Sequence, residues 1–405
     1  MRSIIWFRRD YRLECNPAFT AAHENHTCMG GIVLRMHQDW SGIPNIQKGL
    51  HREVFETECE NELNEKLQGI NLSLWHAHSV ESFLQVLIDE NIDTVYVGAG
   101  VSPYEQGEFT RIQNHLHRLG IDCHTFQNHD LINRNTWPQK PKRGFKSYSE
   151  WKRELPPGFG IETTSMNTEG ISPIKPNGFK GGRMEGLRHM HHYFFTSDGL
   201  SSYEATRNGL LGESYSSRLS PWLALGCLGI REVWSHVIKF ESQRGPTSST
   251  ETFKKELLWR AYFRWVMDTH GVRMFHRDGI RSKPTTWRHS EPEFKAWCEG
   301  KTESAFVNAM MNELNTTGFI GNRARQIAAS YLINELRIDW RWGAAYFEAQ
   351  LIDYDVSSNY GNWAYIAGVG TDPRGGRHFN IQYQEEQHDP DGAYQAFWNK
   401  KTISA

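Results

Sequence analysis

The first 130 residues alternate short apolar runs with stretches of helical periodicity, and this alternation limits the folds open to the chain. Buried strands are predicted over residues 3–7, 31–34, 72–76 and 94–97, and helices over 53–67 and 80–88. Strand–helix–strand alternation builds a mainly parallel sheet covered on both faces, so we expect a doubly wound α/β domain over residues 1–130. Ligands of such folds favour the carboxyl ends of the strands, here near residues 98–100.

A proline- and glycine-rich stretch then divides the chain. Prolines, glycines and polar residues interrupt every periodic pattern there, which predicts an interdomain linker over residues 131–200. The pattern over residues 201–405 is helical, which predicts an all-α second domain. One helix is expected to begin near residue 249 or 250 and to run through 268, and another to span 323–336.

Composition narrows the class of protein. The length of 405 residues suggests two domains, and a net charge of −2 means that a nucleic-acid partner would need a local basic face. Residues 134–153 are a candidate for that face, although a charge run is also typical of plain solvated surface. The six cysteines are scattered, so neither a disulfide framework nor a metal site is expected. Because no run of about 18 apolar residues exists and no signal peptide is evident, we expect a cytoplasmic protein without a membrane span.

Residues 353–363 carry the strongest chemical signal. Asp353 and Asp355 directly follow an apolar pair, and Asn359 and Trp363 come soon after them. Burying a carboxylate is costly unless a cation or several donors meet it. Three arginines are available upstream: Arg323, Arg325 and Arg341. Both a pocket for a large flat cofactor such as a flavin and a helical core with structural ion pairs are compatible with these residues.

Several motifs, in order along the chain, distinguish between these two interpretations. Residues 321–326, 338–341 and 351–363 resemble the flavin domain of the photolyase/cryptochrome family. Residues 367–374 and 377–381 are most similar to its DASH-type branch. Residues 6–13 resemble the opening strand and turn of the family, and residues 206–210 and 216–222 resemble its phosphate-binding and flavin-entry segments. The resemblance covers nearly the whole chain.

This resemblance implies a Rossmann-like antenna domain, a linker and a helical FAD-binding domain. It implies light-driven repair of cyclobutane pyrimidine dimers in DNA by electron transfer from photoexcited reduced FAD, as in a deoxyribodipyrimidine photo-lyase. Similarity to the DASH-type branch implies a preference for single-stranded or unpaired DNA, and we expect a monomer. The alternatives are a cryptochrome-type blue-light photoreceptor without repair activity and a flavoprotein that binds nucleic acid without turnover.

The resemblance also implies which residues hold the cofactor. Arg325 is expected to pair with Asp353, and Asn359 to face the N5 atom of the flavin. The full set implied for FAD is Tyr203, Ser216, Ser217, Arg218, Leu219, Ser220, Phe253, Arg325, Asp353, Asp355 and Asn359.

A second set is implied for the DNA lesion. Burial among aromatic residues is expected to raise the pKa of Glu256, so that its protonated carboxyl donates to a pyrimidine carbonyl. The alternative for Glu256 is an ion pair with Arg260, four residues later on the same helix. Trp259 is expected to stack on the flipped bases. The residues implied for DNA are Glu256, Trp259, Arg260, Asn322, Arg323, Gln326, Arg374 and Arg377.

Three tryptophans match the electron relay of the family. Trp363, Trp340 and Trp287 correspond to its positions from the flavin to the surface, although any one of them alone is more typical of core packing. Together with Glu256 and Asn359 they form the expected catalytic set. Glu108 is the candidate contact for a 5,10-methenyltetrahydrofolate antenna, and an empty antenna site is the alternative.

Overall fold

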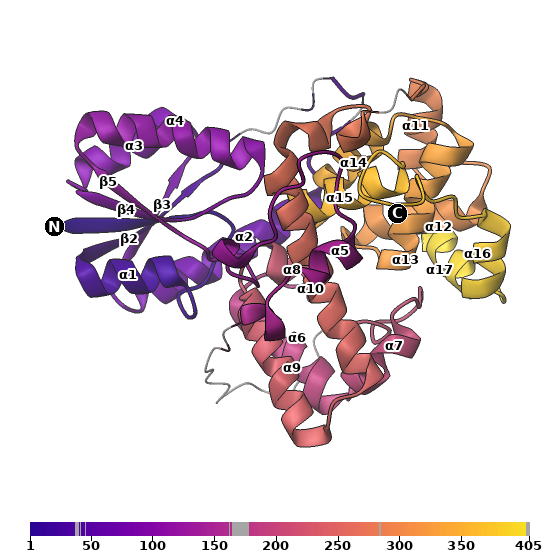
Figure 1. The fold of residues 1–405 in the computed structure, drawn as a ribbon, viewed down its shortest axis with the longest axis horizontal. Coiled ribbons are helices and arrows are strands. Elements are labelled where there is room, and N and C mark those ends of the chain that lie inside the picture. Colours follow the sequence, from indigo (N-terminus) through magenta and orange to yellow (C-terminus); the bar gives the residue numbers. More distant parts are fainter. Residues whose placement is uncertain are drawn as a thin grey trace.

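The computed structural model describes residues 1–36, 40, 42–44, 46–161, 163, 178–282 and 285–401. An N-terminal α/β part lies beside a larger helical part, and the chain passes between them through the linker region (Figure 1). The expected fold class is confirmed. Among the described residues, no helix combines the length and the apolar character needed to cross a membrane.

The N-terminal part is built on a parallel sheet of five strands in the order β3-β2-β1-β4-β5. The strands are β1 (Arg2–Phe7), β2 (Thr27–Leu34), β3 (Ser73–Ala77), β4 (Thr94–Gly98) and β5 (Asp122–Phe126). The helices are α1 (Pro17–Asn25), α2 (Leu50–Gln68), α3 (Val80–Asp89) and α4 (Pro103–Leu119). Alternate residues of β1 face opposite ways: Ile4 and Trp6 pack with α3 and α4, whereas Ile5 and Phe7 pack with α1 and α2. The sheet is therefore covered on both faces (Figure 1).

Three elements of this part were not predicted: α1, α4 and β5. Strand β5 pairs in parallel with β4 at the edge of the sheet, and no residue of β5 is fully buried, so its sequence lacks the apolar run of a central strand. Helix α4 begins with Ser102, whose hydroxyl caps the Glu105 amide, while the Glu105 carboxylate bonds back to the Ser102 amide.

Protein groups occupy the carboxyl edge of the sheet, where a ligand was expected. The guanidinium of Arg134 donates to the carbonyl oxygens of Ala99 and Gly100, at 2.7 and 3.1 Å. The guanidinium of Arg12, in the loop after β1, donates to the carbonyls of Asn128 and Gly226, and the second of these bonds joins that loop to the helical part. This edge therefore serves as a contact between the two parts of the chain.

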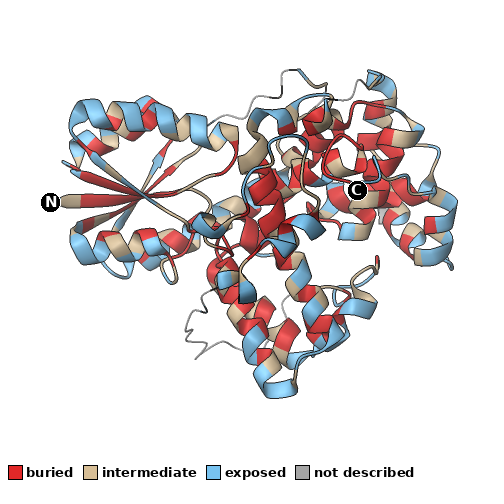
Figure 2. Cartoon of the chain, in the orientation of Figure 1, coloured by how far each residue is buried: buried red, intermediate tan, exposed pale blue. Residues whose placement is uncertain are grey.

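The linker region and the helical part contain thirteen labelled α-helices within the described residues. They are α5 (Tyr148–Arg153), α6 (Arg183–His191), α7 (Tyr203–Thr206), α8 (Ser220–Ala224), α9 (Ile230–Arg244), α10 (Ser248–His270), α11 (Glu291–Cys298), α12 (Ala305–Thr317), α13 (Asn322–Ser330), α14 (Trp340–Gln350), α15 (Val356–Ile366), α16 (Ile381–His388) and α17 (Ala393–Lys401). The long helix α10 packs against α7, α9 and α15. Figure 2 shows buried residues concentrated where the central helices meet and exposed faces on the outer ones.

The helix limits differ slightly from the predicted ones. Helix α10 is capped by the hydroxyl of Thr247, which accepts from the amide of Thr250, so it begins earlier than expected. The helix expected over 323–336 is α13 followed by a π-helical turn, Tyr331–Glu335. Helices α5 and α6 lie inside the predicted linker, of which residues 162 and 164–177 are outside the described part of the chain. The domain limits 1–130, 131–200 and 201–405 stay predictions.

Candidate functional site

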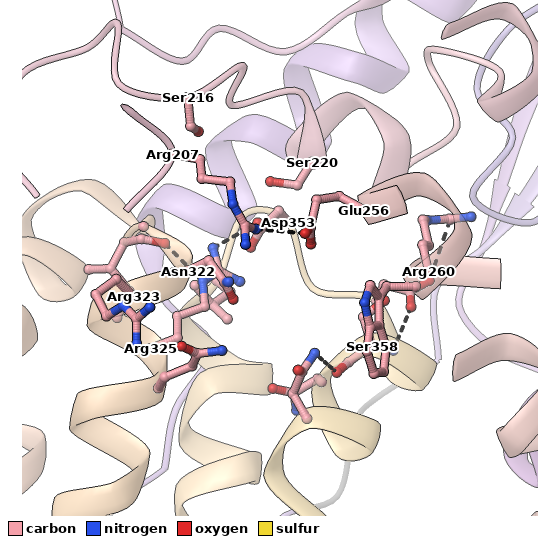
Figure 3. A pocket seen from close by; sticks show the side chains of 18 of the residues that line it. Arg207, Ser216, Ser220, Glu256, Arg260, Asn322, Arg323, Arg325, Asp353 and Ser358 are labelled. Atoms are coloured by element: carbon pink, nitrogen blue, oxygen red, sulfur yellow. Dashed lines mark hydrogen bonds and ion pairs between the residues drawn. The ribbon is translucent and has the colours of Figure 1, made fainter. Parts of the chain in front are cut away.

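A cavity of about 590 Å³ opens in the helical part, between α7, α10, α13, α15 and the turn before α8. Figure 3 shows polar side chains from these segments directed into it. Every residue predicted to hold FAD lines this cavity, and so does every residue predicted to contact DNA except Arg374, which is exposed outside it. The structure thus brings together residues that are more than 150 positions apart in the sequence, from Tyr203 to Arg377.

Asp353 has one carboxylate oxygen satisfied by protein and one left for a ligand. Its Oδ2 lies 2.8 Å from a guanidinium nitrogen of Arg325, the predicted partner. Its Oδ1 is buried without a hydrogen-bond partner. Because leaving a buried charged acceptor unsatisfied is costly, this oxygen indicates a donor supplied by a molecule in the cavity. A flavin cofactor, which carries N–H and O–H donors, fits this requirement.

Asp355 is held by its own helix and by a cation. Its Oδ1 accepts from the amide of Ser358 at 2.8 Å and so caps α15, and its Oδ2 lies 3.5 Å from Arg260. Burial alone would raise the pKa of Asp355, but Arg260, Arg264 and the Ser358 amide outweigh it and hold the pKa at about 2. Asp355 is therefore an anion on the cavity wall at physiological pH.

Asn359 is fixed by the neighbouring helix. Its Nδ2 donates to the carbonyl of Ala344 on α14 at 2.9 Å, which leaves Oδ1 as the group that this side chain can offer to a ligand. Trp363 follows one helical turn later on α15 and also lines the cavity. The two residues therefore form one face of α15 directed at the cofactor position.

The turn from Ser216 to Ser220 supplies hydroxyl groups. Ser216 and Ser220 line the cavity (Figure 3), and the amide of Arg218 donates to the Ser216 hydroxyl oxygen at 3.4 Å. The guanidinium of Arg218 donates to the carbonyl of Gly212 and lies 5.0 Å from the ring centre of Tyr215. The guanidinium of Arg218 is therefore engaged by protein groups of the same wall.

Glu256 is paired with Arg207. A guanidinium nitrogen of Arg207 lies 2.6 Å from Glu256 Oε1 (Figure 3). The expected alternative pair of Glu256 with Arg260 is wrong, because Arg260 is directed to Asp355 and to the carbonyls of His129 and Leu223. Burial raises the pKa of Glu256, and the charge of Arg207 opposes that rise.

Trp259 has one ring face covered by the linker region. The ring of Tyr148, on α5, stacks on it with centroids 4.0 Å apart and planes 11° apart. Tyr365 meets Trp259 edge-on at 6.1 Å. Neither Tyr148 nor Arg207 was predicted as a site residue, since both contacts join segments distant in the sequence. The only available signal was the position of Arg207 inside the motif at 206–210.

The remaining residues predicted for DNA lie around the cavity. Asn322, Arg323 and Gln326 project from the start of α13, and Arg323 donates to Asn208 Oδ1 at 3.3 Å. Arg377 donates to the hydroxyl oxygen of Tyr365 at 3.0 Å. These side chains give one side of the cavity opening a cationic character.

The three tryptophans of the expected relay occupy successive depths. Trp363 lines the cavity, Trp340 is fully buried and Trp287 is half-buried. The indole nitrogens of Trp340 and Trp287 both donate to the carbonyl of Arg277, at 3.0 and 3.3 Å. The two outer indoles are therefore adjacent to each other.

Glu108 lies on α4 of the N-terminal part, away from this cavity. Its carboxylate is 3.1 Å from a guanidinium nitrogen of Arg8, and burial raises the pKa of Glu108. The folate antenna stays a prediction. Among the described residues, no group of His, Cys, Asp and Glu side chains is arranged to hold a metal ion.

Comparisons with known proteins agree with this geometry. The model of the DNA photolyase domain matches residues 3–163, and that of the FAD binding domain of DNA photolyase matches residues 253–401. A cryptochrome DASH of Idiomarina loihiensis is 34% identical over 97% of this chain and 91% of its own length. The solved cryptochrome of Synechocystis sp. has a TM-score of 0.86 and 32% identity, with 98% of this chain and 88% of the other covered. An archaeal photolyase of Sulfolobus tokodaii, solved with two FAD molecules, has a TM-score of 0.80 and 26% identity, with 98% and 90% covered.

These matches extend over nearly the whole chain and include both of its parts. Asp353 with its unsatisfied oxygen lies within the match to the FAD binding domain, whereas the lining residues from Tyr203 to Ala224 precede that match. The chain belongs to the photolyase/cryptochrome family, within its DASH-type branch, and its helical part binds FAD.

Proposed function

We propose that this protein is a light-driven DNA lyase of the deoxyribodipyrimidine photo-lyase type, acting on cyclobutane pyrimidine dimers in single-stranded or unpaired DNA. The observation that carries the proposal is one shared cavity. Its walls combine the cofactor residues around Asp353 and Asn359 with an acid and an aromatic ring, Glu256 and Trp259, suited to a pyrimidine pair. Reduced FAD, when bound and excited by blue light, supplies one electron to the lesion.

Trp259 and Glu256 bind and orient the lesion in this proposal. The ring face of Trp259 not covered by Tyr148 stacks on a base, a contact worth roughly 1–3 kcal/mol. Glu256 holds a proton for a pyrimidine carbonyl, which its burial favours. The ion pair with Arg207 must open for that donation, so Arg207 is released as the lesion enters.

The residues on the opposite wall position the cofactor. Arg325 fixes Asp353, the Ala344 carbonyl fixes Asn359, and Arg260 with the Ser358 amide fixes Asp355. Each of these side chains is held by protein before any ligand enters, which reduces the entropy lost on binding. Trp363, Trp340 and Trp287 form an electron path between this wall and the surface.

DNA reaches the cavity over its cationic side. Arg323 and Arg377 line the opening, and Arg374 is exposed beside it, so that phosphates can contact all three. A cavity of this depth accepts only bases that leave the stack, and unpaired DNA requires least energy for that step. We expect the protein to act as a monomer in the cytoplasm.

A second candidate is a blue-light photoreceptor without repair activity. Two contacts favour it. The ion pair with Arg207 already engages the carboxylate of Glu256, and the ring of Tyr148 covers one face of Trp259.

Blue-light repair of a thymine dimer in single-stranded and duplex oligonucleotides tests the two candidates. The lyase requires repair of the single strand by purified protein under reducing conditions, with little repair of the duplex. Equal repair of both retains the enzyme but contradicts the strand preference. A protein that holds FAD, reduces it in light and repairs neither strand is a photoreceptor.

A further inference from the structure

The cavity has one wall that matches an anion. Ser216, Ser217 and Ser220 contribute hydroxyl groups within a single turn, whereas the carboxylates of Glu256, Asp353 and Asp355 line other walls. The diphosphate of FAD is an anion that needs hydroxyl and amide donors, so the Ser216–Ser220 turn suits it better than the carboxylate walls. This step depends on FAD binding and not on the proposed DNA repair.

The backbone of the Ser216–Ser220 turn includes one residue in an unfavourable conformation. Arg218 has a φ of +48°, a left-handed conformation that is unfavourable for a residue other than glycine. Such a conformation persists only where surrounding contacts impose it. The Arg218 side chain contacts Gly212 and Tyr215 of its own loop and lies over the rings of Phe179 and Phe319, at 5.7 and 5.5 Å. These contacts act on the side chain and not on the Ser217–Arg218 peptide, whose orientation a contact to the peptide itself would fix.

His189 on α6 supplies that contact. Its Nε2 lies 2.8 Å from the carbonyl oxygen of Ser217. Since a carbonyl only accepts, Nε2 carries the proton. Burial, together with the nearby charge of Arg218, lowers the pKa of His189 to about 4, so the ring is neutral at physiological pH. Its other nitrogen, Nδ1, is buried without a hydrogen-bond partner, and the ring packs on Trp222 with centroids 4.9 Å apart.

The planar Ser217–Arg218 peptide links the bond made by His189 to the orientation of a group on the cavity wall. In a trans peptide the C=O of Ser217 and the N–H of Arg218 point in opposite directions. The bond from His189 holds the carbonyl on the α6 side, and the amide of Arg218 is then directed to Ser216 Oγ on the cavity wall. Because the oxygen of the Ser216 hydroxyl accepts a hydrogen bond from the Arg218 amide, its O–H can donate a hydrogen bond to a ligand.

We propose that His189 is a positioning residue that sets the Ser216–Ser220 turn for the phosphates of FAD. His189 does not line the cavity and touches no ligand; it acts through the Ser217–Arg218 peptide.

Flavin affinities of full-length variants test this role. His189→Phe keeps a ring against Trp222 but removes the donor, and we expect its FAD dissociation constant to rise roughly three- to tenfold, as for one lost hydrogen bond. His189→Gln places an N–H near the position of Nε2 and should restore most of the affinity. His191→Phe is the matched control on the same helix, since its ring contacts Phe195 and not the turn. If His189→Phe fails to fold, His189→Asn, whose amide is too short to reach Ser217, replaces it.

Riboflavin separates this role from general loosening of the cavity. It lacks phosphates, so its affinity should be the same in the wild type and in His189→Phe. An unchanged FAD affinity in His189→Phe overturns the proposal. So does an equal loss of riboflavin affinity, or a loss in His189→Gln as large as that in His189→Phe.

Discussion

Arg207 and Glu256 form an ion pair of 2.6 Å across the cavity, although Arg260 lies at the favourable spacing of four residues on the helix of Glu256. Arg260 instead reaches Asp355 on α15. The acid expected to face the lesion is therefore paired with Arg207, the residue that directly follows α7. Burial and the Arg207 charge then act on the pKa of Glu256 in opposite directions.

Removal of the Arg207 charge should therefore extend the pH range of repair. In Arg207→Met the burial effect acts without its main opponent, so the pKa of Glu256 rises and the protonated acid persists to higher pH. We expect the upper pH midpoint of single-strand dimer repair to move upward. Arg244→Met removes an exposed pair with Asp198 and serves as the control. A midpoint that stays in place or moves down contradicts the role assigned to the pair.

Asp353→Asn should weaken FAD binding more than it weakens the fold. The change removes the charge that meets Arg325 and alters the one oxygen left for a ligand, and bonds to charged groups are worth about 1.5–3 kcal/mol, so we expect roughly a tenfold to hundredfold loss in affinity. Asp339→Asn is the matched control: Asp339 is also buried and paired with an arginine, Arg341, but lies outside the cavity. Titration of both variants with FAD, with their melting temperatures, separates the effects. Equal FAD affinity in the two variants would contradict the assignment.

Glu313 should make stability depend on pH. This buried carboxylate accepts from the Tyr394 hydroxyl at 2.5 Å, and burial raises its pKa from 4.5 to about 7. Between these values the unfolded chain releases the proton while the folded one keeps it, so stability falls as pH rises from 4.5 to 7 and is constant above. The loss is about 3 kcal/mol at most.

Glu313→Gln removes this titration, because glutamine stays neutral. The difference in melting temperature between Glu313→Gln and the wild type should therefore grow in favour of the variant between pH 5 and pH 7.5. His129, His189 and His270 have lowered pKa values, which make stability rise with pH in both proteins. Their contribution cancels when the melting temperature of the wild type is subtracted from that of the variant. A pH-independent difference would show that Glu313 does not titrate in this range.

Trp340→Phe should stop most light-driven reduction of bound FAD by an external thiol, because it removes the middle indole of the path. The control is Trp297→Phe. Trp297 is as deeply buried and meets Trp363 edge-on at 6.2 Å, but lies outside the expected series. Flavin absorbance under blue light measures both rates. If Trp297→Phe is the slower of the two, the electron path runs through Trp297 instead.

Tyr148→Ala should weaken dimer binding through Trp259. Loss of the stacked ring removes roughly 0.5–1.5 kcal/mol of aromatic contact and lets the indole rotate, so we expect a dissociation constant about three- to tenfold higher. Tyr148→Phe keeps the stack and should bind like the wild type. Fluorescence anisotropy with a single-stranded dimer oligonucleotide makes the comparison. Equal weakening in both variants would mean that the hydroxyl, and not the stack, matters.

Local sequence patterns predicted much of the fold and of the cofactor wall. The four apolar strands were evident because each is a short contiguous run. The Asp353–Arg325 pair was expected from the resemblance to the flavin domain and not from spacing, since 28 positions separate the two residues. Strand β5 was missed because an edge strand needs no apolar run. The partners of Glu256 and Trp259 were missed because they come from α7 and α5, and only the packing of distant segments selects Arg207 over Arg260.

The linker region is more than a connection between two domains, since Tyr148 from its helix α5 backs the ring of Trp259. The aromatic wall of the cavity is therefore assembled from both sides of the domain junction. An insertion or deletion that displaces α5 should therefore remove the ring behind Trp259 even when every cavity-lining residue is retained. An exchange of the N-terminal domain between relatives should accordingly retain the linker that belongs to the helical domain.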